Sequence, residues 1–177
     1  MASQGRTKRK ASSPERRPSR TAFLLSSLGY HVGRRLAASL EPLDLEPRHF
    51  AVLNAVATQP GQSQQALAAA LQIPPSRMVA ILDDLERRGL VERRSNPSDR
   101  RVRALHLTPG GTSVLTRARR RAADNERRLL AALHPDERER LHELLERVAG
   151  ANGLAGGAHP ALRNGEGASG PGRTPDA

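Results

Sequence analysis

The stretch from Ile73 to Asp99 constrains the fold more than any other part of this chain. It reads IPPSRMVAILDDLERRGLVERRSNPSD, and its two prolines favour the backbone of a first helical turn. Apolar residues then recur at helical spacing as one stripe: Met78, Ile81, Leu82 and Leu85. Gly89 follows as a left-handed residue that ends the helix, and an extended stretch runs to Arg94. The sequence therefore predicts a helix that buries one face, followed directly by a strand.

Two further helices precede this one, and a second strand follows it. Pro47 opens the first helix, whose apolar stripe is Phe50, Leu53, Val56 and Ala57. Ser63 is a good N-cap for the second, whose inward-facing residues are Leu67, Ala70 and Leu71. The turn at 71–74 is only long enough to set two helices at a steep angle. A looser alternation from Arg101 to Leu107 predicts a returning strand, so the unit is a winged helix-turn-helix with this hairpin as its wing.

Three amphipathic helices flank this unit. The first runs roughly from Thr21 to Leu40, with an apolar face at Leu25, Leu28, Val32, Leu36 and Leu40. Thr108 caps a long helix that runs to about Leu133, with a packing seam at Leu115, Ala118, Ala122, Asn125, Leu129 and Ala132. The last helix starts at His134, with a stripe at Leu141, Leu144, Leu145 and Val148. Because these stripes would otherwise face water, we expect a helical dimerisation platform, in a fold that is mainly α with a small β-hairpin wing.

The charge balance favours a nucleic-acid partner. The chain has 29 Lys and Arg against 18 Asp and Glu, a formal net charge of +11. Such a field attracts polyanions, although it does not separate DNA from RNA or an acidic membrane surface. Aromatic residues make up only 2% of the chain, which disfavours the stacking platforms that bind single strands. Because the chain has no cysteine, disulfides, thiolate sensing and cysteine-ligated zinc are excluded.

Catalytic, metal-binding and membrane functions find little support. The six histidines are scattered without metal-ligand spacing, and Gly110-Gly111 lacks the strand and spacing of a nucleotide loop. No run approaches the roughly 20 apolar residues that span a membrane, and no cleavage site follows the basic N-terminal stretch. We therefore expect a cytoplasmic protein that is not an enzyme and has no cofactor, metal or membrane partner. The rival hypothesis is a winged-helix interaction module that binds an acidic protein partner or RNA.

Three segments together carry a family resemblance. They are LEPRHFAVLNAVA (45–57), QSQQALAAALQIPPSRMVAILDDLERRGLVERR (62–94) and the wing with the next helix start, DRRVRALHLTPGG (99–111). From about 25 to 150 the chain resembles the MarR family of transcription regulators. The resemblance implies a homodimer that binds an inverted repeat in double-stranded DNA, usually as a repressor. It also implies a small aromatic or anionic effector that binds between the platform and the DNA-binding lobes.

The resemblance places the reading residues at the start of the recognition helix, on Ser76 and Arg77, with Ala80 a turn further along. Arg77 either donates a bidentate pair to guanine or makes a simple phosphate contact. At the preceding helix start, Ser63 and Gln64 lie where backbone amides can face phosphate.

In the wing, Arg101 matches the family arginine that enters the minor groove. Asp99 matches the acid that braces this arginine, unless it merely caps a turn. Other wing arginines are expected to be phosphate neighbours or a solvated face: Arg93, Arg94, Arg100 and Arg103.

Three positions depart from the family pattern. Gln72 stands where the turn commonly has glycine, so a left-handed backbone there would cost about 1 kcal/mol. Pro74 replaces a capping residue and removes a side-chain acceptor. Ala80 stands where many relatives carry a polar or basic reader, so no relative's operator transfers to this chain.

An effector site is expected at the crevice bordered by the helix at 21–40 and the helix that Pro47 opens. His31, Arg34 and Arg35 lie on the former and His49 on the latter. They offer cationic and hydrogen-bonding partners to a small anion beside Phe50 and Leu53. The alternative is that the histidines are ordinary interface residues and that the two arginines face solvent.

The expected organisation has five parts. Residues 1–20 form a disordered basic tail, either a solvated solubility tail or an arm that tracks DNA. A dimerisation helix occupies 21–45, the DNA-binding winged helix-turn-helix 46–108 and the further dimerisation helices 109–152. Residues 153–177, rich in Gly, Ala and Pro, form a second disordered tail.

Overall fold

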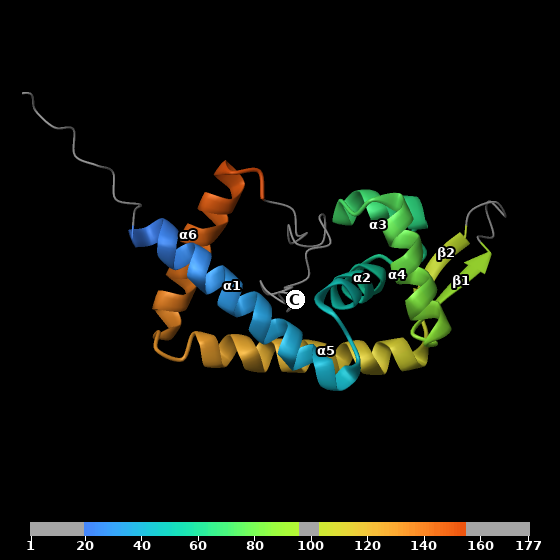
Figure 1. Ribbon diagram of the computed structural model, residues 1–177, viewed down its shortest axis with the longest axis horizontal. Coiled ribbons are helices and arrows are strands. Elements are labelled where there is room, and N and C mark those ends of the chain that lie inside the picture. Colours follow the sequence, from blue (N-terminus) through green and yellow to red (C-terminus); the bar gives the residue numbers. More distant parts are fainter. Residues whose placement is uncertain (1–19, 96–102, 155–177) are drawn as a thin grey trace, which may run out of the picture.

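The structure is a computed structural model that describes residues 20–95 and 103–154. Its elements follow the order α1 (Arg20–Leu40), η1 (Glu41–Leu43), α2 (Pro47–Thr58), α3 (Gln64–Leu71), α4 (Pro75–Arg87), β1 (Val91–Ser95), β2 (Arg103–Leu107), α5 (Pro109–Leu129) and α6 (Pro135–Ala151) (Figure 1). The strands β1 and β2 pair as one antiparallel hairpin. The fold is therefore mainly α with a small β-hairpin, as the sequence predicts.

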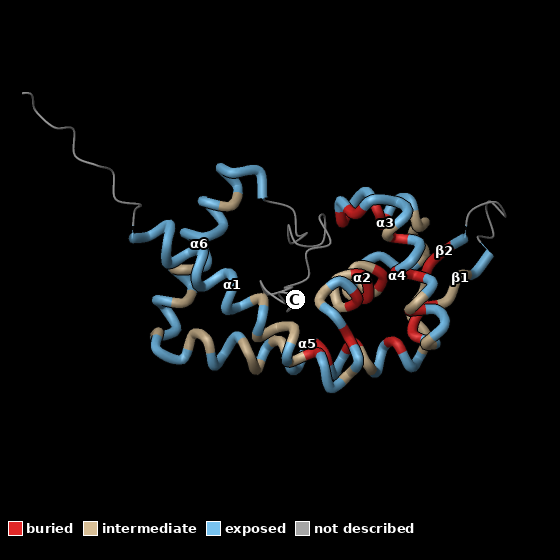
Figure 2. The backbone as a smooth tube through the Cα atoms, viewed as in Figure 1, coloured by how far each residue is buried: buried red, intermediate tan, exposed pale blue. Residues whose placement is uncertain are grey.

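The helix α5 runs beneath both parts of the molecule (Figure 1). On one side lie α2, α3, α4 and the hairpin, and on the other lie α6 and most of α1. Buried residues gather in α2, α3, α4 and the N-terminal half of α5, whereas α6 and the N-terminal half of α1 are exposed (Figure 2). The molecule thus has one well-packed lobe and a second part, formed by α6 and most of α1, whose helices are largely exposed.

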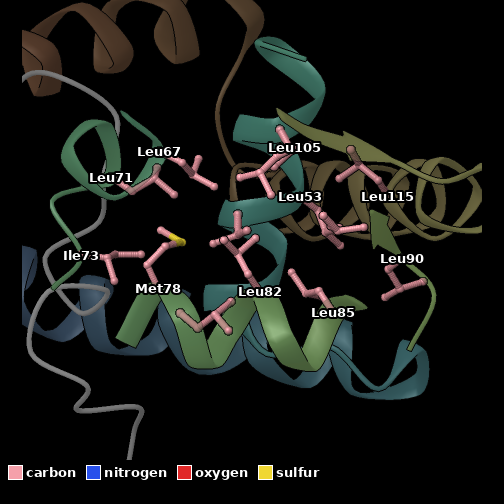
Figure 3. Close-up of a cluster of buried hydrophobic side chains, with 14 of the residues drawn as sticks. Leu53, Leu67, Leu71, Ile73, Met78, Leu82, Leu85, Leu90, Leu105 and Leu115 are labelled. Atoms are coloured by element: carbon pink, nitrogen blue, oxygen red, sulfur yellow. The ribbon is translucent and has the colours of Figure 1, made fainter. Parts of the chain in front are cut away.

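The packed lobe is built around the predicted stripe of α4, all four residues of which are buried. They pack with leucines from α2, α3, the turn before β1, β2 and α5, and this cluster includes Leu53, Leu67, Leu71, Leu90, Leu105 and Leu115 (Figure 3). Burying one such side chain stabilises a fold by about 1.5–3 kcal/mol. The N-terminal turns of α5 contribute Leu115 and Ala118 to this same core, so α5 belongs to both parts of the molecule.

The predicted helix boundaries are largely confirmed. Four helices begin at a proline, namely Pro47, Pro75, Pro109 and Pro135. Proline fixes φ near its helical value, and its missing N–H would be unpaired in a first turn anyway. Gly89 adopts φ 66° after α4, which is the left-handed geometry expected of a residue that ends a helix.

Two details of the sequence prediction are wrong. In α3 the buried alanine is Ala68, whereas Ala70 is exposed, because the buried face runs through positions i, i+1 and i+4 at Leu67, Ala68 and Leu71. The helix α5 ends at Leu129 rather than near Leu133, where the chain tightens into a turn closed by a hydrogen bond from Leu133 N–H to the Leu130 carbonyl at 3.0 Å.

Most of the two predicted tails lies outside the described residues. Of the first tail only Arg20 is described, and it is the first residue of α1 rather than part of a tail. Of the second, Gly153 and Leu154 complete a turn after α6, in which Leu154 N–H donates to the Ala149 carbonyl at 2.9 Å.

Candidate nucleic-acid interface

The helix-turn-helix begins at the N-terminus of α3, which is joined to the wing. Ser63 is the N-cap, and its Oγ accepts a hydrogen bond at 3.1 Å from a backbone N–H of the first turn. Just before it, Gly61 N–H donates to the Leu105 carbonyl at 2.8 Å, and Leu105 N–H donates to the Gln62 carbonyl at 3.0 Å. These bonds fix the half-buried Ser63 and Gln64 relative to β2.

The turn between α3 and α4 has the left-handed backbone for which the family commonly uses glycine. Gln72 is left-handed at φ 53°, and its N–H donates to the Ala69 carbonyl at 3.1 Å. Pro74 is the N-cap of α4 and provides no side-chain acceptor. The buried side chain of Ile73 anchors this turn in the core, which offsets the cost of about 1 kcal/mol for the left-handed residue.

The first two turns of α4 present a polar face to solvent. Ser76 and Ala80 are exposed and Arg77 is half-buried, while Met78 and Ile81 point into the core. A hydroxyl and a guanidinium can bond base edges or phosphate, and a methyl group can contact a thymine methyl. This face therefore has the size and chemistry to enter a major groove.

The described part of the wing is a regular ladder. Arg93 pairs with Leu105 across it, and Ser95 pairs with Arg103 at its outer end. Arg94 is exposed, and its Nε donates to Glu92 at 3.0 Å. The predicted wing-tip residues Asp99, Arg100 and Arg101 lie outside the described residues.

Arg93 has a role that the sequence analysis missed. Only 17% of its side chain is exposed, and its guanidinium lies 2.6 Å from Asp83 Oδ1 and also contacts Glu86, both on α4. It further donates to Gln64 Oε1 on α3 at 3.4 Å. Arg93 is therefore an internal connection between the wing and both helices of the helix-turn-helix, and not a free phosphate ligand. The acids at i and i+3 on α4 are the only signal in the sequence for this role.

His49 is the one buried polar or charged residue in the described part of the chain. Its Nδ1 accepts the N–H of Glu46 at 3.2 Å, which closes the capping box of α2. The proton of the neutral ring then lies on Nε2, 3.7 Å from Asp84 Oδ2 on α4. Burial lowers the pKa of His49, and the charges of Glu46, Arg48, Asp84 and Arg88 act in opposing directions.

Asp84 receives two cations from its own helix. Arg88 Nη1 lies 3.3 Å from its Oδ2, and Arg87 contacts its other oxygen. Burial alone would raise the pKa of Asp84, but the Arg88 hydrogen bond and the surrounding positive charges outweigh it and leave this pKa below its usual value. The carboxylate is thus ionised whenever the protein is near neutral pH.

A cavity of about 760 Å³ adjoins these residues. Its lining includes Ala37 from α1, His49 from α2, and Arg77, Ala80 and Asp84 from α4. Of the residues expected to form the effector site, only His49 borders it. Arg34 lies over the Tyr30 ring at 5.9 Å, His31 is exposed on α1, and Phe50 packs against the core. The structure therefore does not bring His31, Arg34 and Phe50 together with His49 in one pocket.

The described ranges, 20–95 and 103–154, hold no group of three His, Asp or Glu side chains that could coordinate a metal ion. None of their helices is long and apolar enough to cross a membrane.

Comparison with known proteins identifies the chain. The sequence profile of the MarR family matches residues 43–102, which run from the end of η1 into the wing. A curated relative from Thauera aromatica, described as a putative transcriptional regulatory protein for the hcr operon, is 32% identical over 133 residues. The match covers 71% of this chain and 80% of the relative. The chain belongs to the MarR family.

Solved MarR-family structures share the fold along most of the chain. The transcriptional repressor CouR, bound to a 23-mer DNA duplex, is 36% identical, with a TM-score of 0.66 over 72% of this chain and 91% of CouR. CouR from Rhodococcus jostii, bound to p-coumaroyl-CoA, is 30% identical, with a TM-score of 0.63 over 74% of this chain and 92% of that one. This MarR-family protein is thus a DNA-binding winged-helix transcription regulator and not an enzyme.

Mild acid should destabilise this MarR-family regulator through His49. Because burial lowers the folded-state pKa below the ordinary value of 6.5, the unfolded chain binds the proton first as the pH falls. The contribution of the neutral ring is fully present above pH 6.5 and is lost between that value and the lower folded-state pKa. Urea unfolding at about pH 7.5 and about pH 5.5 should therefore give a lower free energy of unfolding at the acidic value.

The control for this prediction is His49→Gln, which keeps a polar side chain without a titrating ring. The variant should be less stable at both pH values, since the capping box is altered, but it should show a smaller loss between them. An equal loss in the parent and the variant would assign the pH dependence to other groups.

Proposed function

We propose that this regulator acts as a homodimeric repressor that binds an inverted repeat in duplex DNA and is released by a small aromatic or anionic effector. The observation that carries the proposal is the solvent-facing start of α4, where Ser76, Arg77 and Ala80 stand on a helix held by the core behind it. CouR, which shares this fold, is a repressor bound to a DNA duplex. The likeness supports DNA binding by this chain, and we assign the contact to α4.

The proposed DNA contacts are of two kinds, those to base edges in the major groove and those to phosphate or the flanking minor groove. Arg77 reads a base edge in the major groove, and Ser76 and Ala80 contact the neighbouring edges. Other residues grip phosphate or the flanking minor groove, and these are Ser63, Gln64, Arg94, Asp99, Arg100 and Arg101. In this scheme Asp99 braces Arg101.

The proposed division of the chain follows from what is packed and what is exposed. The segment 46–108 contacts DNA, whereas 21–45 and 109–152 join the two protomers. In support, the large apolar side chains left exposed lie mainly on α1 and α6, and they include Phe23, Leu24, Leu25, Leu28, Leu144, Leu145 and Val148. Contiguous exposed apolar residues of this kind typify a protein interface.

The test of DNA reading is Arg77→Ala. Loss of one bidentate base contact should weaken binding to the preferred inverted repeat by about 1–3 kcal/mol and relax selectivity at one base pair per half-site. Selection of bound duplexes from a random pool defines the repeat, and titration of single-base variants measures the selectivity. The two half-sites should lie roughly 34 Å apart, one turn of B-DNA.

The matched control is Arg87→Ala, the same change at the far end of α4, where 71% of the side chain is exposed. It should leave base selectivity unchanged. If both variants lose affinity equally on all sequences, Arg77 contacts phosphate and does not read a base. If the protein prefers RNA or an acidic protein to any duplex, the proposed function itself is wrong.

The proposed effector belongs to the chemical class of aromatic acids and their thioesters. CouR binds p-coumaroyl-CoA, a member of that class. The cavity beside His49 supports such a ligand because it also borders Arg77 and Ala80, so a molecule seated there would alter the DNA-facing helix. Titration of operator complexes with aromatic carboxylates and their thioesters measures the coupling, which linkage makes equal in both directions.

A further inference from the structure

The last residue of the α1–η1 arm is bonded to the end of the recognition helix. Asp44 follows η1 with a left-handed backbone at φ 54°. Arg88, the C-cap of α4, donates through Nη2 to the Asp44 carbonyl, and the same nitrogen lies 3.2 Å from Asp44 Oδ2. Only 21% of the Arg88 side chain is exposed. A cation at the end of α4 is thus held by a residue 44 positions earlier in the chain.

The same guanidinium continues into α2. Its Nη1 donates to Asp84 Oδ2, and that oxygen faces Nε2 of the buried His49. We refer to Asp44, His49, Asp84 and Arg88 as the Arg88 joint. Within it, one arginine spans η1, α4 and, through Asp84, the capping box of α2. Removing Arg88 would leave Asp84 with Arg87 as its remaining cation and the 94% exposed Asp44 side chain without this ion pair, and it would release α4 from the α1–η1 arm at this point.

A small rotation at the Arg88 joint would displace the far end of α1 by a much larger distance. Helix α1 has 21 residues and is therefore about 31 Å long, with its exposed apolar residues towards the end far from Asp44. A tilt of roughly 6° between α1 and α4 would displace that far end by about 3 Å over this length. Successive base pairs of B-DNA are about 3.4 Å apart, so a tilt of this size displaces the far end of α1 by a distance comparable with one base-pair step.

We propose that Arg88 is a positioning residue that sets the distance between the two recognition helices and so the half-site spacing that the regulator accepts. The inference rests on the proposed homodimer and its inverted repeat. Arg88 itself contacts no DNA in this scheme. It acts by fixing the angle between α4 and the helix that joins the protomers. This role predicts a change in spacing selectivity, whereas a merely stabilising ion pair predicts only a change in stability.

The test is binding of the full-length protein to a series of inverted repeats whose spacing differs by single base pairs. The parent should prefer one spacing by at least about tenfold, since off-spacing sites strain one half-site contact. Arg88→Gln should reduce that preference to about threefold or less while keeping the base preference within each half-site. Its thermal stability is measured in parallel.

Arg87→Gln is the matched control, because Arg87 also contacts Asp84 but does so within α4, from a side chain that is 71% exposed. It should keep the parent's spacing preference. Asp44→Asn, which removes the negative charge opposite Arg88 but keeps the backbone carbonyl acceptor and a residue that tolerates a left-handed backbone, should relax the preference in the same direction as Arg88→Gln but by less. It serves as the test if Arg88→Gln does not fold.

Two results would overturn the inference. An Arg88→Gln or Asp44→Asn protein that discriminates spacing as steeply as the parent shows that the joint does not set it. Uniform loss of affinity at every spacing, together with lower thermal stability, shows a structural role only. A parent without any spacing preference is a different outcome, since it overturns the inverted-repeat proposal and the joint's role with it.

Discussion

Gly111→Ala should be among the most damaging single substitutions in this protein. A Cβ at this position would lie 1.9 Å from the Leu90 carbonyl oxygen and 2.8 Å from its carbon. Both atoms are backbone, so no side chain can turn away, and the start of α5 must separate from the end of the α4–β1 turn. That separation also strains the hydrogen bond from Thr108 N–H to the Leu90 carbonyl.

The expected cost is about 3–5 kcal/mol, at the upper end for a single substitution. For a chain of this size the melting temperature should fall by roughly 10 °C or more. Equilibrium urea unfolding and a thermal melt measure both quantities. Such a loss is a large part of the roughly 5–15 kcal/mol that stabilises a typical domain.

The neighbouring glycine provides the control. A Cβ on Gly110 would meet the Gly89 carbonyl and Thr108 Oγ1 at 3.5 Å, which is ordinary van der Waals contact. Gly110→Ala should therefore be neutral or stabilise by up to about 1 kcal/mol, because alanine restricts the unfolded chain. If the two substitutions destabilise the protein to the same extent, the close approach at Gly111 is not what determines its cost.

Replacing two exposed apolar residues on α6 should separate the protomers. In Leu145→Gln/Val148→Gln, two side chains that are exposed in the single chain become polar. If they are buried between protomers as proposed, the double variant should be monomeric at concentrations where the parent is a dimer. Its affinity for the inverted repeat should fall by about 10²–10⁴-fold, because each half-site then binds independently.

The control double variant is Glu143→Gln/Glu146→Gln, which places the same residues at the same spacing on the polar side of α6. It should remain a dimer. Analytical ultracentrifugation and operator titration give the two readouts. A parent that is monomeric and still binds an inverted repeat tightly would contradict the proposed dimer.

Periodicity and helix ends were predictable from the sequence because they are local. The stripe of α4 repeats at helical spacing, and the starts of α2, α4, α5 and α6 each carry a proline whose ring has one preferred backbone. The left-handed backbone at Gln72 was indicated only by the family resemblance, since relatives commonly have glycine at this position. Whether Ala68 or Ala70 is buried was not predictable from the sequence. The two side chains are identical, and which one is buried depends on where the neighbouring helices pack against α3.

The long-range ion pairs could not be predicted from the sequence, for a different reason. Arg93 meets Asp83, and Arg88 meets Asp44, only after the turns between them have set the helix directions. Nothing in an arginine's neighbours along the chain distinguishes such a residue from a solvated one. The same holds for His49, whose burial and capping role depend on α4 packing over the start of α2.

The sharing of α5 between the two parts of the molecule limits how this protein can be divided or recombined. A fragment that ends at residue 108 would keep every element of the winged helix but would remove Leu115 and Ala118 from beneath it. The apolar surface that these two residues cover would then be exposed to solvent and would promote aggregation. A chimaera that exchanges DNA-reading units between regulators should therefore be joined within α5 after residue 118, where the helix has left the core.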